Sequence, residues 1–108
     1  MDVFYALAEP NRRRIVELLA GRGSLTATEI CDKFNITAQA VSQHLKVLRE
    51  TKLVTVERHA QQRIYQLNPE TIGEVERWTL QMKQQWEERF QRLDEVLANE
   101  KKRNARKR

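Results

Sequence analysis

The stretch that decides the fold is Thr37-Ala-Gln-Ala-Val-Ser-Gln-His-Leu-Lys-Val-Leu-Arg-Glu50. Val41, Leu45 and Leu48 recur at intervals of four and three residues, which predicts one apolar face of a helix. Thr37 belongs to the residue types that cap helix N-termini, so the helix is expected to occupy the rest of this stretch. The opposite face is polar and contains Gln39, Ser42, Gln43 and Lys46. We therefore predict an amphipathic helix that packs on one side and is exposed on the other.

A second, shorter helix is predicted just upstream. Thr26-Ala-Thr-Glu29 matches a capping box, in which the Thr hydroxyl and the Glu29 carboxylate each accept from a backbone N–H. Ile30 and Phe34 follow one turn apart. Asn35 is expected to be left-handed and to form a turn with Ile36. Two short helices joined in this way make a helix-turn-helix unit.

The residues before this unit predict two more helices. Val3 to Ala8 is a short apolar segment that is expected to be helical, and Pro10 suits the first turn of a new helix. Gly21 and Gly23 are expected to end that second helix. Its apolar face is assigned to Ile15, Leu18 and Leu19. Its polar face is assigned to Arg12, Arg13, Glu17 and Arg22.

After Lys52 the pattern changes from a helical to an extended one. Leu53–Arg58 and Arg63–Leu67 are rich in β-branched and aromatic residues, which predicts a β-hairpin. The connection, His59–Gln62, lacks the Asn-Gly pair of common hairpin turns, so its turn type stays open. The expected fold class is mainly α with a small β-hairpin, a winged helix-turn-helix in which the hairpin is the wing.

A long final helix is predicted from about residue 70 to residue 99. Its apolar side chains follow a three-four spacing, and no turn signal follows that would fold the helix back on itself. Such a stripe needs a partner.

Charge is unevenly distributed along the chain. The formal net charge is +5, but Lys101–Arg108 holds six of the twenty Lys and Arg residues and no acid. Residues 1–100 therefore carry fourteen basic against fifteen acidic residues, a charge of −1. We expect one domain at residues 1–99 and a basic, disordered tail at residues 100–108. That tail either attracts a polyanion or is only a solvated end.

The polar helix face and the hairpin together predict binding to double-stranded DNA. Between Lys46 and Arg63 there are five basic and two acidic residues, a local charge of +3. Gln side chains can bond adenine edges in the major groove, and a basic hairpin can reach the backbone or the minor groove. A merely solvated helix face is the alternative, and His44 and Tyr65 are expected to be structural. The candidate DNA-binding residues are Thr37, Ala38, Gln39, Ser42, Gln43, Lys46, Arg58, His59, Gln61, Gln62 and Arg63.

Four segments resemble the ArsR-type winged helix-turn-helix repressors: Leu7-Ala-Glu-Pro-Asn-Arg-Arg-Arg-Ile15, Ala40-Val-Ser-Gln-His-Leu-Lys-Val-Leu48, Leu53-Val and Arg63-Ile-Tyr-Gln-Leu67. The resemblance extends in order and spacing over about residues 3 to 98. It implies a homodimer formed through the first and last helices, and repression by occupancy of a near-palindromic operator. The expected dimer interface is Val3, Phe4, Leu7, Ile72, Val75, Thr79, Met82, Trp86, Phe90 and Leu93.

Many members of this family sense metals, but their ligand patterns are missing here. Where the thiol-rich site has Cys-x-Cys, this chain has only Cys31, and the last helix contains no His. Soft metals need two or more thiolates, and zinc usually takes four ligands. We predict no metal and no cofactor, and interpret Cys31 as a small buried residue. The alternative is a metal- or thiol-responsive repressor, for which Cys31→Ser would abolish the response and leave operator binding intact.

Other classes of protein are disfavoured. The chain has no Gly-rich phosphate loop, no nucleophile elbow and no catalytic constellation, so an enzyme is not expected. No apolar run approaches the roughly 20 residues that cross a bilayer, and the N-terminus does not match a signal peptide. The single cysteine suits a reducing cytoplasm. A third interpretation is an interaction module whose long helix binds another protein. The effector stays open.

Overall fold

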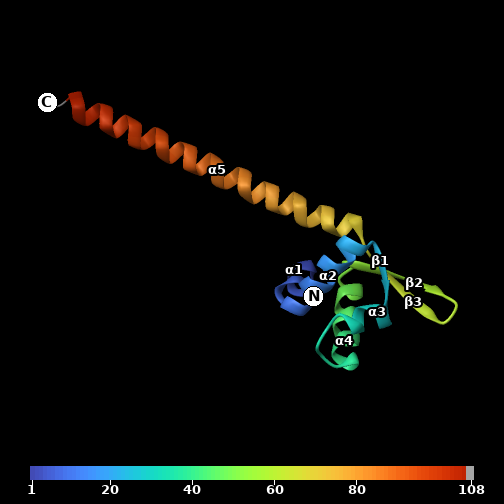
Figure 1. The fold of residues 1–108 in the computed structure, drawn as a ribbon. Coiled ribbons are helices and arrows are strands. Elements are labelled where there is room, and N and C mark those ends of the chain that lie inside the picture. Colours follow the sequence, from blue (N-terminus) through green and yellow to red (C-terminus); the bar gives the residue numbers. More distant parts are fainter. Residues whose placement is uncertain (107–108) are drawn as a thin grey trace. The chain divides into compact units, whose positions relative to one another are not determined.

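The chain divides into two units in the computed structural model, which describes residues 1–106 (Figure 1). The first unit comprises residues 1–74, and the second begins at Val75. Within the described residues the fold is mainly helical with a small antiparallel sheet, so the predicted fold class is confirmed. The elements are α1 (Val3–Ala8), α2 (Pro10–Arg22), β1 (Ser24–Thr26), α3 (Ala27–Asp32), α4 (Ala38–Glu50), β2 (Val54–His59), β3 (Gln62–Leu67) and α5 (Pro69–Arg106).

The predicted helix-turn-helix forms from α3 and α4, and both helices begin with the expected caps. The Thr26 hydroxyl accepts from the Glu29 N–H at 3.2 Å, and the Glu29 carboxylate accepts from the Thr26 N–H at 3.1 Å. The Thr37 hydroxyl accepts from the Ala40 N–H at 3.0 Å. These bonds satisfy backbone donors that have no partner inside the helix. The prediction of a left-handed Asn35 is wrong, because the bend is spread over residues 33–37 and needs no positive φ there.

Glu9 lies between α1 and α2 and caps the second helix. Its carboxylate accepts from the Arg12 N–H at 2.9 Å, and Pro10 takes the first turn as predicted. The assignment of Arg12 to the polar face is wrong, because this side chain is only 9% exposed. Its Nε donates to the Ala6 carbonyl at 2.8 Å and its Nη2 to the Tyr5 carbonyl at 3.2 Å. The last carbonyls of a helix lack intrahelical partners, so the buried guanidinium satisfies those of α1.

The predicted hairpin is present, and an additional strand extends it. β2 and β3 pair antiparallel from Val54 opposite Leu67 to His59 opposite Gln62, and β1 pairs with the other edge of β3. β1 has three residues, which is too short for an alternating pattern to reveal it. In the two-residue turn of the hairpin only Ala60 has a positive φ, 56°, which excludes type I′.

The joint between α4 and β2 has a Schellman geometry with lysine in the position that usually holds glycine. Lys52 has a φ of 63°. Its N–H donates to the Arg49 carbonyl at 3.1 Å, and the Leu53 N–H donates to the Leu48 carbonyl at 3.0 Å. Leu48 and Leu53 are fully buried and supply the apolar contact of this motif. The joint therefore fixes where the hairpin leaves α4.

The core of the first unit is formed by the apolar faces of α2, α3 and α4 against the sheet (Figure 1). Its largest fully buried side chains are Ile15, Leu19, Ile30, Val41, Leu48, Leu53 and Val54. Leu18, which was assigned to the same face of α2, is half-buried. Because the underside of α4 is part of this core, the direction of its polar face is fixed.

α5 begins at Pro69 and continues to Arg106, past the predicted end at Asn99. The Asn68 side chain accepts from the Glu70 N–H at 3.2 Å, and the Thr71 hydroxyl donates to the Lys52 carbonyl at 2.6 Å. Every side chain from residue 76 to residue 105 is exposed. Residues 107–108 of the predicted tail lie outside the described residues.

Candidate nucleic-acid interface

The polar face of α4 is open to solvent along its length, whereas its underside is buried. Val41, Leu45 and Leu48 are 0–4% exposed. All of the α4 residues predicted to contact DNA are exposed, together with the cap residue: Thr37, Ala38, Gln39, Ser42, Gln43 and Lys46. The Thr37 hydroxyl is engaged in the helix cap, so this residue positions the start of α4. An exposed polar helix on a rigid apolar support is the arrangement that the DNA-binding prediction requires.

The hairpin presents its predicted contact residues to solvent as well. These are Arg58, His59, Gln61, Gln62 and Arg63. Arg58 lies directly opposite Arg63 across the two strands. His59 Nε2 lies 3.4 Å from a carboxylate oxygen of Glu57, which is two residues earlier on β2. The hairpin therefore carries two adjacent arginines on one face and a histidine–carboxylate pair on the other.

A polar pocket brings part of the helix face and part of the hairpin together. It has a volume of about 120 Å³ and is lined by Ser42, Gln43, Lys46, Arg49, Arg63 and Tyr65. Gln39, Arg58 and the residues of the hairpin turn do not line it. The sequence prediction did not include Arg49, although its spacing of three from Lys46 and seven from Ser42 places it on the same face. Which residues of α4 face the hairpin depends on the tertiary packing, which the spacing does not reveal.

His44 joins α4 to the α1–α2 segment, in agreement with its interpretation as a structural residue. Its side chain is 17% exposed, and Arg12 Nη1 lies 3.3 Å from His44 Nδ1. A Glu9 carboxylate oxygen lies 3.8 Å from the same nitrogen. Burial by itself raises the pKa of Glu9, but the Arg12 backbone N–H and the charges of His44 and Arg12 outweigh it, so the pKa lies below its usual value. The cluster fixes α4 against α1 and α2.

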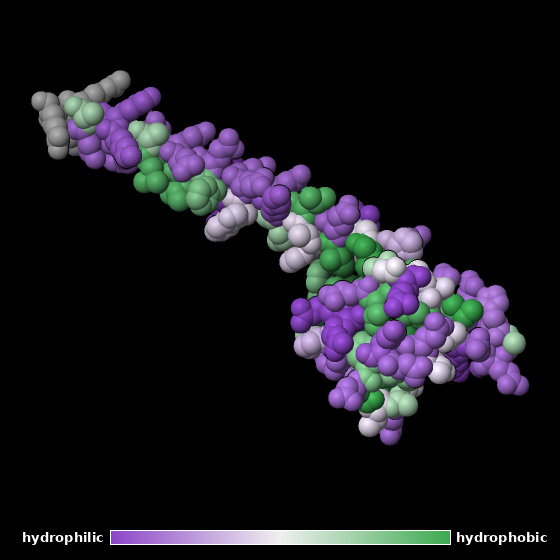
Figure 2. Space-filling model, in the orientation of Figure 1, coloured by the Kyte–Doolittle hydropathy of each residue, from purple (hydrophilic) through white to green (hydrophobic). Residues whose placement is uncertain are grey.

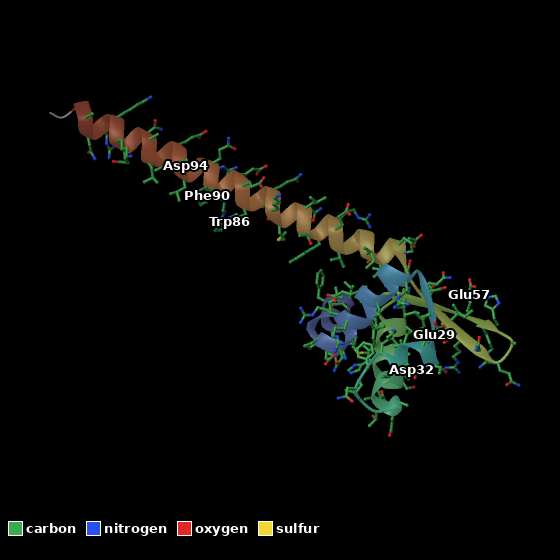
Figure 3. All side chains as sticks on the ribbon, viewed as in Figure 1. Glu29, Asp32, Glu57, Trp86, Phe90 and Asp94 are labelled. Atoms are coloured by element: carbon green, nitrogen blue, oxygen red, sulfur yellow. The ribbon has the colours of Figure 1, made fainter. Side chains whose placement is uncertain are left out.

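The residues expected at a dimer interface differ in exposure. Val3 is 9% exposed and packs within the first unit, and Leu7 and Val75 are half-buried. The exposed members are Phe4, Ile72, Thr79, Met82, Trp86, Phe90 and Leu93. Apolar side chains gather along α5 in Figure 2, and Figure 3 shows Trp86 and Phe90 projecting from this helix near Asp94. The two rings lie 6.4 Å apart between centroids.

Cys31 is a free, half-buried thiol on α3. Figure 3 shows Glu29 and Asp32 on the same helix and Glu57 on β2. Among residues 1–106, no three His, Cys, Asp or Glu side chains are grouped in a way that could hold a metal ion. The described helices include none that is both long and apolar enough to span a membrane.

Comparison with known proteins gives consistent results. A family model described as a helix-turn-helix domain matches residues 7–57. The transcriptional repressor SdpR of Bacillus subtilis (strain 168) is 35% identical over 79 residues, which cover 73% of this chain and 87% of SdpR. The arsenic resistance transcriptional regulator ArsR2 of Pseudomonas putida (strain KT2440) is 34% identical over 88 residues, which cover 79% of this chain and 76% of ArsR2.

Comparison with solved structures gives the same fold as the family model and the sequence relatives. An ArsR-like transcriptional regulator from Rhodococcus sp. RHA1 superposes with a TM-score of 0.80 at 22% identity, covering 90% of this chain and 88% of that chain. The match in sequence with SdpR and ArsR2 extends over most of each relative. The chain therefore belongs to the ArsR family of winged helix-turn-helix transcriptional regulators, which bind DNA and are not enzymes.

Proposed function

We propose that the protein is a homodimeric repressor that occupies a near-palindromic operator. In this proposal α4 lies in the major groove, and the β2–β3 hairpin contacts the DNA backbone or the minor groove. A two-fold dimer then places two copies of α4 about 34–36 Å apart, in successive turns of the groove. As a DNA-binding regulator, the protein is expected to act in the cytoplasm.

The observation that carries this proposal is the two-sided character of α4. Its apolar underside is buried, and Gln39, Ser42 and Gln43 are exposed together on the other side. Any amphipathic surface helix has a buried underside, so the feature that favours DNA over a merely solvated face is the neighbouring hairpin with its two adjacent arginines. The relative SdpR is named a transcriptional repressor, which favours repression over activation.

The dimer is supported by the exposed apolar stripe of α5. Trp86 is 67% exposed, and Met82, Phe90 and Leu93 are 39–54% exposed. Monomeric proteins rarely expose contiguous apolar patches of this kind, so a second copy is the natural cover for the stripe. Thr79 fits such an interface because its hydroxyl already donates to the Val75 carbonyl at 2.8 Å.

Arsenic, which appears in the name of ArsR2, is not carried over to this chain as an effector. The chain has one cysteine, whereas soft metals require two or more thiolates. The proposal therefore includes no metal, and the effector stays open.

Selection of duplexes from a random pool, followed by mobility shift, tests the proposed function. We expect the wild-type chain to enrich two inverted half-sites about 10–10.5 base pairs apart, centre to centre, or at a multiple of that distance. Sedimentation of the same preparation should show a dimer. Enrichment of a single half-site by a monomer would refute the dimer. Absence of any shift at low salt and micromolar protein would instead favour the interpretation in which α5 binds another protein.

A further inference from the structure

The pocket between α4 and β3 has the composition of an anion site. Three of its six lining residues are the cations Lys46, Arg49 and Arg63, and Ser42 and Gln43 add neutral donors. Its volume of about 120 Å³ lies well below the roughly 300–1,000 Å³ of small-molecule sites. The pocket therefore suits a small charged group better than an organic effector.

The cations of this pocket have few acidic partners. Lys46 Nζ lies 4.0 Å from a carboxylate oxygen of Glu50, and both side chains are well exposed. Within residues 1–106, Arg49 and Arg63 have no carboxylate within 4.0 Å. Two guanidinium groups thus border the pocket without a counter-charge from the chain, which leaves a positive potential in it.

The hairpin adds to this potential rather than reducing it. Arg58 lies directly opposite Arg63, and like charges that face each other across two strands are destabilising. Because side chains alternate along a strand, Glu57 projects from the opposite face of β2 to Arg58. The acid of the hairpin is thus kept away from the face that carries both arginines. Such an arrangement costs stability in the free protein and is relieved when an anion binds.

The walls of the pocket are held by the fold. Tyr65 is 4% exposed and lies in the central strand of the sheet. Ser42 and Arg49 belong to the helix whose underside forms part of the core. A group that binds in this pocket contacts both α4 and the hairpin. It therefore fixes the position of both elements on the ligand that carries it.

We propose that this pocket seats one backbone phosphate of duplex DNA, held by Arg49 from α4 and Arg63 from β3. This inference rests on the proposed DNA-binding function and adds a defined phosphate site to it. Phosphate contacts carry no sequence information, but they set the register in which the neighbouring side chains, Ser42 and Gln43, meet the base edges. Arg49 is therefore a positioning residue for base recognition.

Binding of Arg49→Gln to duplexes selected by the wild-type chain tests the site. We expect about tenfold weaker binding to the selected duplex and to a scrambled one alike, because a charge-assisted phosphate contact is lost. The slope of log affinity against log salt should fall by about 0.9, so that the wild type loses about threefold more affinity than the variant between 50 and 200 mM salt. Arg49→Lys should keep the slope, and Arg13→Gln on α2 should change neither quantity. Circular dichroism checks that each variant is folded.

Neutral methylphosphonates, placed one at a time in the selected duplex, identify the source of the anion. At one position the substitution should weaken DNA binding by the wild type and should not weaken binding by Arg49→Gln any further, since both changes remove the same contact.

If the wild type selects DNA but Arg49→Gln matches it in affinity and salt slope, the pocket assignment is wrong and the proposed function stands. If inorganic phosphate saturates the amide resonances of Ser42 and Arg49 but no methylphosphonate couples to Arg49, the pocket takes a free anion and the proposal is overturned. If the wild type selects no duplex, both proposals fail.

Discussion

Lys52 adopts a strained backbone conformation at the joint between α4 and the hairpin. Its φ of 63° lies in the left-handed region, which costs an L-residue roughly 1–2 kcal/mol. Glycine adopts this conformation freely but loses more chain entropy on folding. We expect Lys52→Gly to stabilise the fold by about 0.5–1 kcal/mol, measured by urea unfolding. A matched Lys33→Gly, where φ is −90°, should be destabilising. Destabilisation by Lys52→Gly would contradict this prediction. It would mean that the lysine side chain stabilises the fold by more than its left-handed backbone destabilises it.

Glu9 gives stability a defined dependence on pH. Its pKa is lowered in the folded state, so it stabilises the fold at pH values above its usual 4.5, and this contribution is lost as the pH falls through the lower folded-state value. Glu9→Gln keeps an acceptor for the Arg12 N–H and removes the charge.

For Glu9→Gln we expect a loss of about 0.5–1 kcal/mol in unfolding free energy at pH 7, as for a charged helix cap. This loss should shrink as the pH falls through the lowered pKa of Glu9. Denaturant unfolding at several pH values measures this difference in unfolding free energy. Glu17→Gln, at an exposed position of α2, is the control. A difference between wild type and variant that stays constant with pH would contradict the pKa shift.

Gln43 is the α4 residue from which we expect base recognition. A bidentate contact between Gln and adenine discriminates by about 1–3 kcal/mol, so Gln43→Ala should lose that much at the selected site and relax the preference at one base pair. Affinity for a scrambled duplex should stay the same. Gln66→Ala, an exposed glutamine of β3, is the control. Unchanged base preference in Gln43→Ala would remove this residue from the recognition surface.

The candidate site could be predicted residue by residue only in part. The exposed face of α4 follows from the spacing of Val41, Leu45 and Leu48, because a helix has a fixed period. The sequence could not predict that Arg49 and Arg63 line one pocket, since this depends on how the hairpin packs against α4. The burial of Arg12 was also missed, because its partners are carbonyls of α1 and an imidazole of α4, and none of them has a local sequence signal.

Elements with strong local signals were the ones that the sequence predicted. α3 and α4 start at their caps, and α2 ends before Gly23, whose φ is 86°. The prediction that Gly21 also ends α2 is wrong, because the helix continues through it to Arg22. β1 was missed because three residues hold too little pattern, and pairing with β3 is what makes them a strand. The sequence predicted that α5 ends at residue 99, whereas the helix continues to Arg106. A run of charged residues is compatible with a solvated tail and with a solvated helix almost equally, so it does not reveal where the helix ends.

The residues of α5 that are expected at the dimer interface repeat over seven residues. Ile72, Thr79, Trp86 and Leu93 are spaced in this way, as are Val75 and Met82. A seven-residue repeat of this kind is typical of left-handed coiled coils, so we expect two copies of α5 to pack with that supercoil.

Trp86 lies at the middle of that repeat. We expect Trp86→Asp to dissociate the dimer, because it places a charge in the centre of an apolar contact. Sedimentation equilibrium measures the change. Gln84→Asp, on the opposite side of α5, adds the same charge and should leave the dimer intact. If Trp86→Asp remains dimeric, the interface lies elsewhere on the molecule.

At the scale of the whole molecule, the exposure of α5 links helix formation to association. From residue 76 to residue 105 every side chain is exposed in the single chain, and helices without tertiary packing are marginal in water. We therefore expect the helical signal in circular dichroism to fall on dilution through the dimer dissociation constant, while Trp86→Asp shows the lower signal at every concentration. A signal independent of concentration would show that α5 is stable alone.

In the proposed dimeric repressor, the exposed surface of α5 would make repression depend on the concentration of the chain. Below the dimer dissociation constant, the amount of competent repressor grows with the square of the chain concentration. Doubling synthesis would quadruple the occupied fraction of a weakly filled operator. Repression would therefore respond more steeply than linearly to the concentration of the chain, without any effector.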